Sequence, residues 1–248
     1  MSANRPTEQI YKNYTSQDFL VWKILFNRQM EILKPIVSEE YLKAIEKINF
    51  SGDKIPAFSE VNNLLHSITG WELKVVPNIS PQNDFFMYLS HKKFTATCWL
   101  RTMEQLDYLE EPDMFHDVFG HVPLLSNQAY VDFFKGISEI ALKYANDPKT
   151  FELLGKIYWF TIEFGLIREN NFLKIYGAGI ISSKEETVFC LSEKAVHHAF
   201  DVETIFNTDY RTDVLQKEYF IIDSFEQLYQ SLLEIESLLQ KSLKPVFS

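Results

Sequence analysis

Two of the six histidines lie in one otherwise apolar stretch, Glu111-Pro112-Asp113-Met114-Phe115-His116-Asp117-Val118-Phe119-Gly120-His121-Val122-Pro123-Leu124-Leu125. The prediction of fold and function starts from this stretch. His116 and His121 are five residues apart, and a regular α-helix would turn them about 140° away from each other. They can bind one metal ion only if the helix ends between them. Gly120 and Pro123 predict such an end, because glycine caps helices and proline cannot continue the hydrogen-bond ladder. On this pair alone, two unrelated structural histidines are an equal alternative.

A single carboxylate further along the chain favours a metal site. Glu163 interrupts the apolar segment 158–166, where an ionised carboxylate is costly unless a metal, a cation or several hydrogen bonds receive it. Two imidazoles and one carboxylate form the set that leaves positions open on Fe(II) for dioxygen and a co-substrate. Zinc in a His2Glu site that activates water for hydrolysis is the alternative. The H-E-x-x-H motif of zinc peptidases is absent, and Asp117 would replace its glutamate only from a poor position.

The composition indicates a globular protein without a polyanionic partner. The 248 residues suffice for one large domain, and a hydrophobic fraction of 46% argues against disorder. The net charge of −10, with scattered basic residues, argues against nucleic acid or an anionic membrane as partner. Neither a signal peptide nor a run of about 18 apolar residues is present, so we expect a cytoplasmic protein. The two cysteines follow neither a redox nor a zinc spacing.

The rest of the chain predicts one predominantly helical α+β domain. Residues 1–14 are polar and are expected to be a loosely held tail, followed by a single catalytic domain over residues 15–248. Capping residues and helical spacing predict helices that begin near residues 15, 38 and 59, another over 158–166, and one launched by a capping box at Ser224. We expect the last of these to pack on its own domain rather than in a coiled coil. Alternating segments at 71–76, 93–100 and 174–181 predict a small β-sheet of two to four short strands.

Six segments, in order along the chain, resemble those of the pterin-dependent aromatic amino acid hydroxylases, and in particular the bacterial members that act on phenylalanine. They cover residues 106–113, 115–117, 119–124, 157–166, 176–179 and 182–183. The resemblance implies the catalytic-domain fold of that family and, by motif position, His116, His121 and Glu163 as the catalytic iron ligands. It also implies that L-phenylalanine is hydroxylated to L-tyrosine with Fe(II), O2 and a tetrahydropterin.

The choice of a small-molecule reductant agrees with what the sequence lacks. Monooxygenation needs two electrons besides those that the substrate supplies. The sequence contains no G-x-G-x-x-G nucleotide loop and no set of cysteines for an iron–sulfur cluster. The reductant must therefore arrive as a separate molecule, which would be tetrahydrobiopterin or a bacterial equivalent.

The resemblance also assigns the substrate pocket. Arg101 corresponds to the arginine that binds the substrate carboxylate, a role that suits the guanidinium fork. Trp159 precedes Glu163 by four residues, which places both on one face of an α-helix. Because tryptophan hydroxylases have Phe at this position, Trp159 argues against tryptophan as substrate. The other implied substrate-binding residues are Phe164, Gly179, Ser182 and Glu186, although Ser183 and Glu186 also have the spacing of a capping box for the next helix.

Four further residues are implied for the pterin, namely Ile79, Phe85, Asp117 and Tyr158. Phe85 corresponds to the ring that stacks on the pterin, and Tyr158 lines the same chamber. Asp117 would lie near the pterin through water. The loop before Phe85 departs from the Gly-Leu that is usual in the family, because it contains Asn78-Ile79. Asparagine tolerates a left-handed backbone, so the path of the loop can be kept while its contacts change.

Three other functions are compatible with parts of the pattern. They are a hydroxylase of tyrosine or tryptophan, a zinc hydrolase, and an inactive binding protein, of which the last is disfavoured because all three ligand positions are intact. The chain begins where the catalytic region of the family begins, so no regulatory domain and no allosteric activation by phenylalanine are expected. We expect a monomer whose partners are small molecules only.

Overall fold

The structure, a computed structural model, describes residues 5–107 and 109–243. Residues 1–4 of the predicted tail, residues 244–248 of the predicted domain and Tyr108 of the family-like segments lie outside this part. The α-helices are α1 (Ser16–Leu33), α2 (Glu39–Lys47), α3 (Phe58–Ile68), α4 (Gln82–Ser90), α5 (Gln128–Lys143), α6 (Pro148–Tyr158), α7 (Ala178–Ser182), α8 (Lys184–Phe189), α9 (Val202–Asn207), α10 (Phe225–Gln230) and α11 (Leu232–Leu243). Three short 3-10 helices are η1 (Tyr11–Asn13), η2 (Met103–Gln105) and η4 (Pro123–Ser126), and two π-helices are η3 (Phe115–His121) and η5 (Trp159–Glu163).

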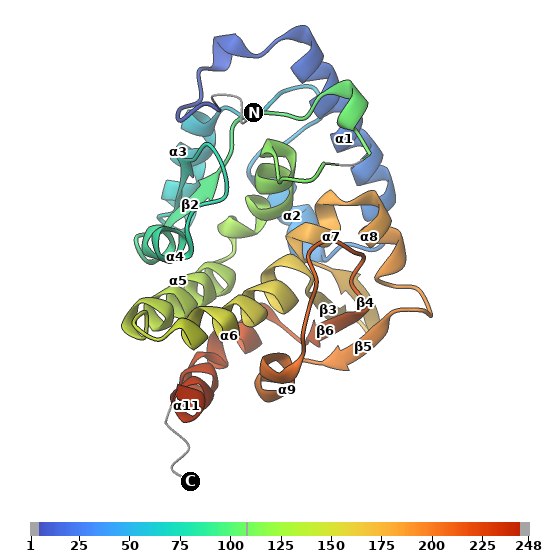
Figure 1. Cartoon of the computed structure of the whole chain (residues 1–248). Coiled ribbons are helices and arrows are strands. Elements are labelled where there is room, and N and C mark those ends of the chain that lie inside the picture. Colours follow the sequence, from blue (N-terminus) through green and yellow to red (C-terminus); the bar gives the residue numbers. More distant parts are fainter. Residues whose placement is uncertain (1–4, 108, 244–248) are drawn as a thin grey trace.

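The described strands form two separate sheets. They are β1 (Glu72–Val75), β2 (Lys93–Ala96), β3 (Leu166–Glu169), β4 (Phe172–Ile175), β5 (Val196–Ala199) and β6 (Glu218–Ile222). β1 and β2 pair in parallel, and the larger sheet has the order β4-β3-β6-β5, in which only the β3–β4 pair is antiparallel. The larger sheet lies on the right in Figure 1 below α7 and α8, whereas β2 lies on the left beside α3 and α4. The predicted class, mainly helical α+β, is confirmed, but the sheet is divided in two.

The first helices begin where oxygen-bearing side chains can cap them. Thr15 accepts a hydrogen bond from the backbone N–H of Asp18, whose carboxylate accepts one from the N–H of Thr15, so the two residues form a capping box. Ser38 accepts from the N–H of Tyr41 at the start of α2. Both predicted starts are confirmed. The third helix begins at Phe58, one residue before the predicted start.

Three segments differ from the sequence prediction. The aromatic residues after the loop at 78–84 belong to α4, which begins at Gln82 and buries Phe86 and Leu89. The predicted helix over 158–166 is divided, because α6 ends at Tyr158, η5 follows, and β3 begins at Leu166. The predicted strand over 174–181 ends at 175, after which α7 begins. In these last two segments the apolar pattern correctly predicts which residues are buried. Packing against other parts of the chain determines whether the backbone there is helical or extended.

One cluster of buried apolar side chains extends from Val21 in α1 to Leu239 in α11. The C-terminal seam contributes to it, since α10 contacts α5, and α11 contacts α5, α6 and α9. The seam therefore packs on its own domain, as predicted, although α10 ends at Gln230 and α11 starts at Leu232. Within the described ranges, no helix is both long and apolar enough to span a membrane.

The N-terminal segment contacts the domain more closely than a loose tail would. The hydroxyl of Tyr14 donates to the carbonyl of Cys98 at 2.7 Å, and Gln9 Nε2 donates to the carbonyl of Pro56 at 3.0 Å. The guanidinium of Arg5 lies 3.9 Å from the ring centroid of Trp99. For the described residues 5–14, the expectation of a loosely held tail therefore does not agree with the contacts.

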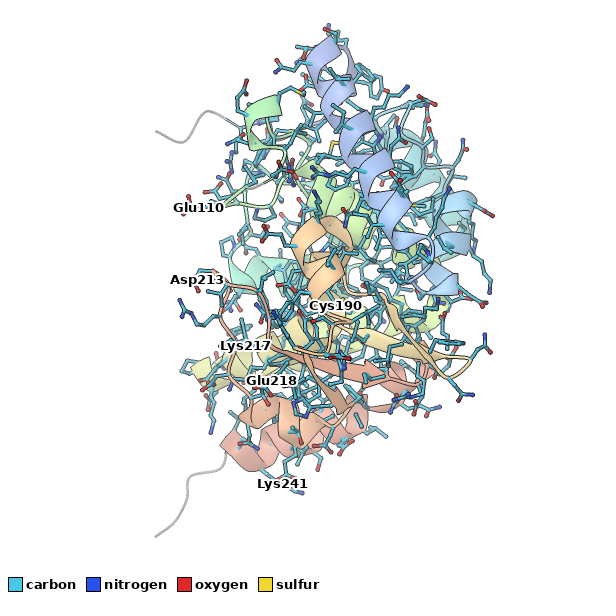
Figure 2. All side chains as sticks on the ribbon, turned by 90° about the vertical axis from the view of Figure 1, so that its right-hand side faces the viewer. Glu110, Cys190, Asp213, Lys217, Glu218 and Lys241 are labelled. Carbon is cyan, nitrogen blue, oxygen red and sulfur yellow. The ribbon has the colours of Figure 1, made fainter. Side chains whose placement is uncertain are left out.

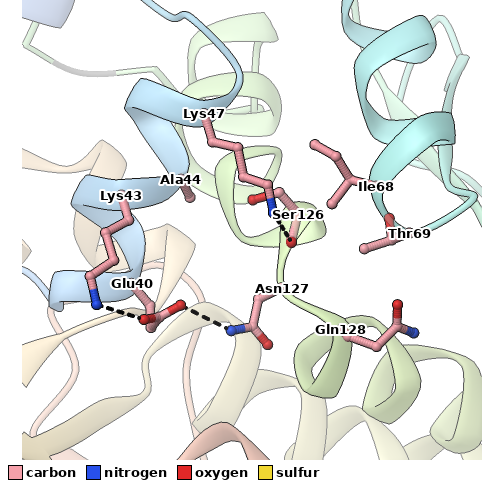
Figure 3. Close-up of a pocket in the computed structure, with 9 residues that line it drawn as sticks. All are labelled: Glu40, Lys43, Ala44, Lys47, Ile68, Thr69, Ser126, Asn127 and Gln128. Carbon is pink, nitrogen blue, oxygen red and sulfur yellow. Dashed lines mark hydrogen bonds and ion pairs between the residues drawn. The ribbon is translucent and has the colours of Figure 1, made fainter.

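A surface hollow between α2 and the start of α5 is lined by polar groups that bond to one another (Figure 3). The carboxylate of Glu40 accepts from Lys43 Nζ at 3.0 Å and from Asn127 Nδ2 at 3.2 Å. Lys47 Nζ donates to the carbonyl of Ser126 at 3.3 Å. These bonds tie α2 to the segment that joins η4 to α5.

Candidate metal centre

The two histidines lie on η3, which is a π-helix. In a π-helix each backbone N–H bonds to the carbonyl five residues earlier, one residue further than in an α-helix. Residues five apart therefore lie much closer to one face of the helix than they would in an α-helix, and the rings of His116 and His121 have centroids 5.1 Å apart at an interplanar angle of 83°. The prediction that the helix ends between them is wrong, because the wider turn brings them together without a break. Pro123 instead begins η4.

Glu163 is the last residue of η5, and its carboxylate reaches both imidazoles. Oε1 lies 3.2 Å from Nε2 of His121, and Oε2 lies 3.7 Å from Nε2 of His116. The three ligand atoms lie within 4.8 Å of one another. Within residues 5–107 and 109–243, no other group of three or more His, Cys, Asp or Glu side chains converges in this way.

α7 contacts both π-helices, and glycine permits this close packing. A Cβ added to Gly177 would lie 2.4 Å from the carbonyl oxygen of Glu163, and one added to Gly179 would lie 2.8 Å from Cζ of Phe164. The close backbone approach predicted for the Gly-Ala-Gly sequence therefore exists. The approaching groups belong to the segment that carries Glu163, so Gly179 acts on the site through packing.

Ser182, at the end of α7, determines which nitrogen of His116 carries hydrogen. Its Oγ lies 2.8 Å from His116 Nδ1 and 2.8 Å from the carbonyl oxygen of Ala178. A carbonyl can only accept, so the single hydroxyl hydrogen goes to Ala178. Nδ1 of His116 must then donate to Ser182, which leaves the lone pair of Nε2 directed at the metal position. The resemblance implies a place for Ser182 in the substrate pocket, and its described contacts show that it also orients a metal ligand.

His121 is held by packing rather than by a polar partner. Its ring centroid lies 4.9 Å from that of Phe94 and 6.4 Å from that of Tyr158, and the residue is 2% exposed. Nδ1 of His121 is buried without a hydrogen-bond partner among the described residues. The two histidines therefore differ, because a hydrogen bond orients one and aromatic neighbours orient the other.

The electrostatics of Glu163 suit a cation. Burial alone would raise the pKa of this carboxyl group, but the imidazoles of His121 and His116 and the hydroxyl of Tyr158 lower it to about 2. The group is therefore ionised at neutral pH in an otherwise apolar setting. Burial also raises the pKa of Tyr158 well above its usual value, which keeps its hydroxyl protonated as a donor.

These residues fit a resident divalent metal ion. One ionised carboxylate and two imidazole nitrogens converge on one point, and the set provides three ligands while leaving the remaining positions to other molecules. Both iron(II) and zinc accept this donor set. The donor chemistry alone therefore does not choose between a monooxygenase and a hydrolase.

Asp117 lies beside His116 and faces the end of β2. Its Oδ2 accepts from the backbone N–H of Thr97 at 2.7 Å and from the Thr97 hydroxyl at 2.8 Å. Burial raises the pKa of Asp117, while His116 and the two bonds from Thr97 oppose that rise. Asp117 thus links the histidine segment to the smaller sheet.

Arg101 is tied to the same segment through Asp113, a completely buried carboxylate. Nε and Nη2 of Arg101 donate to Oδ2 and Oδ1 of Asp113 at 3.0 and 2.8 Å. Oδ1 of Asp113 also accepts from the backbone N–H of His116 at 3.3 Å. One edge of the guanidinium is therefore used inside the chain. Among the described residues, Nη1 of Arg101 makes no hydrogen bond, and the guanidinium is held at a position fixed relative to the histidines.

The implied pterin residues are brought together in part. The rings of Phe85 and Tyr158 lie 5.4 Å apart at 85°, and Tyr158 in turn lies beside His121. These aromatic side chains thus connect α4 to the metal ligands. Ile79 is 74% exposed, and none of the described aromatic contacts brings it into this group.

Among the remaining implied substrate residues, Phe164 is a direct neighbour of Trp159. The indole lies 4.6 Å from the ring of Phe164, which follows Glu163 directly. Glu186 is not directed at an open pocket, because its carboxylate accepts from the backbone N–H of Gln216 at 2.8 Å and from the hydroxyl of Tyr219 at 2.6 Å. Glu186 therefore affects the site only indirectly, through the residues to which it bonds.

Sequence reasoning missed the residues that support the ligands, above all Asp113 and Thr97. Asp113 lies just before η3 and precedes His116 by three residues, so a carboxylate in front of an apolar run was an available signal. Thr97 and Gln216 carry no comparable signal, because their partners lie far away in the sequence.

Comparison with known proteins agrees with this geometry. A family model described as biopterin-dependent aromatic amino acid hydroxylase matches residues 4–248. The phenylalanine-4-hydroxylase of Ralstonia nicotianae is 42% identical over 225 residues, which cover 90% of this chain and 72% of that protein. The corresponding enzyme of Chromobacterium violaceum is 41% identical over 219 residues, which cover 88% and 73%.

Solved structures are similar as well. The crystal structure of C. violaceum phenylalanine hydroxylase with bound Fe(III) superposes with a TM-score of 0.91 at 39% identity, covering 96% of this chain and 86% of that one. A structure of the same enzyme with iron(III) and the oxidised cofactor 7,8-dihydrobiopterin gives a TM-score of 0.89 at 38% identity, covering 97% and 88%.

Proposed function

Because the chain belongs to the biopterin-dependent aromatic amino acid hydroxylases, we propose that it is an iron- and tetrahydropterin-dependent phenylalanine 4-monooxygenase that converts L-phenylalanine and O2 to L-tyrosine. The observation that carries this proposal is the convergence of His116, His121 and Glu163 within 4.8 Å. The similar enzyme of C. violaceum holds iron and dihydrobiopterin, which favours iron over zinc. When bound, the iron, O2 and pterin supply the oxidising chemistry.

The metal ligands require little rearrangement to act. Glu163 supplies the negative charge, and Ser182 keeps the Nε2 lone pair of His116 available. The three ligands come from two π-helices clamped by α7, so they hold one geometry and leave the other positions to O2 and the co-substrate.

The substrate would be bound at both of its ends. The free edge of Arg101 receives the amino acid carboxylate as a bidentate pair. Trp159 and Phe164 form an apolar wall for the ring next to Glu163. Fixing both ends holds one ring carbon toward the metal and excludes water, which is the contribution that positioning makes to catalysis.

The pterin would stack on Phe85 within the chamber that Tyr158 shares with His121. An edge-on Tyr158 ring supports such a stack from the side. Asp117 lies on the ligand segment and would contact the pterin through water. Ile79 contributes at the rim, where its exposure permits contact with the outer part of the cofactor.

Reconstitution tests the proposal. The purified protein is loaded anaerobically with Fe(II) and then given O2, a tetrahydropterin and each aromatic amino acid. Tyrosine should form from phenylalanine only when iron and pterin are both present, and His116→Ala and Glu163→Ala should lose iron while remaining folded. Turnover of tyrosine or tryptophan in preference to phenylalanine would favour the alternative hydroxylase. Hydrolysis with zinc and without pterin would refute the proposal.

We also propose a monomer that acts in the cytoplasm as a single catalytic domain. The described core is continuous from α1 to α11, which supports the single domain. Size-exclusion chromatography with light scattering checks the state, since a dimer would double the expected mass of 29.1 kDa.

A further inference from the structure

We propose that Gln216 is a positioning residue that sets the orientation of the Trp159 indole and thereby the discrimination between aromatic substrates. This inference rests on the proposed function of the site. Its starting observation is that the indole Nε1–H of Trp159 donates to Oε1 of Gln216 at 3.0 Å. Gln216 is 5% exposed and lies 57 residues further along the chain.

The amide of Gln216 can adopt only one orientation. Its Nε2 donates to the carbonyl oxygens of Arg211 at 2.7 Å and Val214 at 3.0 Å, while its Oε1 accepts from Trp159. A flipped amide would set N–H against N–H and oxygen against two carbonyls. The side chain therefore presents a fixed acceptor to the indole.

The backbone of Gln216 is anchored just as firmly. Its N–H donates to Glu186 on α8, and Glu186 accepts a second bond from Tyr219 at the start of β6. The loop leading to Gln216 has Asp213 at the outer edge of the molecule and enters β6 through Lys217 and Glu218 (Figure 2). A buried carboxylate from another element thus fixes the inner end of an exposed loop.

The same loop also contacts the face of the indole. The ring of Tyr210 stacks on Trp159 with centroids 4.5 Å apart and an interplanar angle of 17°. Stacking alone allows the indole to slide and rotate in its plane, whereas a hydrogen bond at Nε1 removes that freedom. Trp159 begins η5 and Glu163 ends it, so the wall that Gln216 fixes is built on the ligand-bearing segment itself.

The test compares Gln216→Met, Trp159→Phe and the double variant with wild type. Met keeps the volume of Gln but lacks the acceptor. Gln216→Met removes the bond from the indole and also the two bonds to the loop carbonyls. We expect loss of the indole bond to raise the KM for phenylalanine roughly three- to tenfold. It should also change the ratio of kcat/KM for phenylalanine to that for tryptophan and oxidise more pterin per tyrosine formed. In the Trp159→Phe background, where no N–H exists, the same substitution should change the KM by less than about twofold.

Two controls separate positioning from loop stability. Gln29→Met removes another buried glutamine, which bonds to Thr187 on α8, and should lower thermal stability while leaving the substrate ratio unchanged. Gln216→Glu keeps an acceptor for the indole, and as a buried neutral acid it can donate one of the two bonds to the loop carbonyls. It should therefore lower thermal stability but retain the wild-type substrate ratio. If Gln216→Met does not fold, Gln216→Asn replaces it in the test. Its side chain is one methylene too short to bond to both Trp159 and the loop, so we expect the same changes in KM and in the substrate ratio.

The outcomes distinguish this inference from the proposed function. Wild-type protein that forms no tyrosine refutes the function itself. Active wild type with an unchanged substrate ratio in Gln216→Met, or with equal effects of that substitution in both backgrounds, overturns only the role of Gln216. Calorimetric titration of phenylalanine without pterin measures the same weakening of binding in the absence of turnover.

Discussion

Removing the Ser182 hydroxyl should weaken iron binding without removing any metal ligand. In Ser182→Ala, Nδ1 of His116 loses its only described partner, which lies 2.8 Å away. The imidazole is then free to place hydrogen on either nitrogen and to rotate, and each change withdraws the Nε2 lone pair from the metal. Loss of such a supporting bond typically costs about 10- to 100-fold in metal affinity, which corresponds to about 1.4–2.8 kcal/mol.

A chelator competition under anaerobic conditions measures this loss. The Kd for Fe(II) is determined for wild type, Ser182→Ala, Ser182→Thr and Ser183→Ala. Threonine keeps the hydroxyl and should stay near wild type. Ser183 caps α8 by accepting from the N–H of Glu186, so Ser183→Ala should cost about 1 kcal/mol of stability with little change in iron affinity. A Kd for Ser182→Ala within about twofold of wild type would refute the hydrogen-bond argument for His116.

Three further predictions concern the surroundings of the metal. Arg101→Lys keeps the charge but loses the fork, so the KM for phenylalanine in steady-state assays should rise at least about tenfold; an unchanged KM would remove Arg101 from the substrate site. Gly179→Ala would place a Cβ 2.8 Å from Phe164 Cζ, so urea unfolding should show a loss of about 1–3 kcal/mol; an equally stable variant would show that Phe164 can move aside. Burial raises the pKa of Glu186 above its usual 4.5, so its contribution to folding is fully present below pH 4.5 and is lost as the pH rises through the raised value. Glu186→Gln should therefore lose less stability than wild type between pH 4.5 and 7, and a larger loss in the variant would contradict this sign.

The sequence identifies metal ligands more readily than their geometry. An ionisable side chain in an apolar segment is costly without a partner, so Glu163 and the histidines could be singled out from residue type and context. The predicted reason why His116 and His121 meet is wrong, because the helix does not end between them but runs through both as the π-helix η3. Local periodicity could not reveal it, because packing against α7 contributes to that backbone choice.

Supporting residues are harder to predict for a similar reason. Ser182 bonds to a histidine 66 positions away, and Gln216 to an indole 57 positions away. Serine and glutamine are common polar residues whose local setting gives no sign of a distant partner. The resemblance to a known family placed Ser182 near the substrate, but only the fold shows which atom it contacts.

The five-residue helix α7 links the spacing of the ligands to the protonation of one of them. Its start fits against Glu163 because Gly177 has no side chain, and a Cβ on Gly120 would lie only 2.9 Å from the carbonyl of Ala178. That same carbonyl receives the hydroxyl hydrogen of Ser182 and so makes Ser182 an acceptor for His116. A shift of α7 away from η3 would also break the hydrogen bond between His116 and Ser182. Substitutions at Gly120 and Ser182 should therefore be non-additive in iron affinity, since each disturbs the interaction on which the other depends.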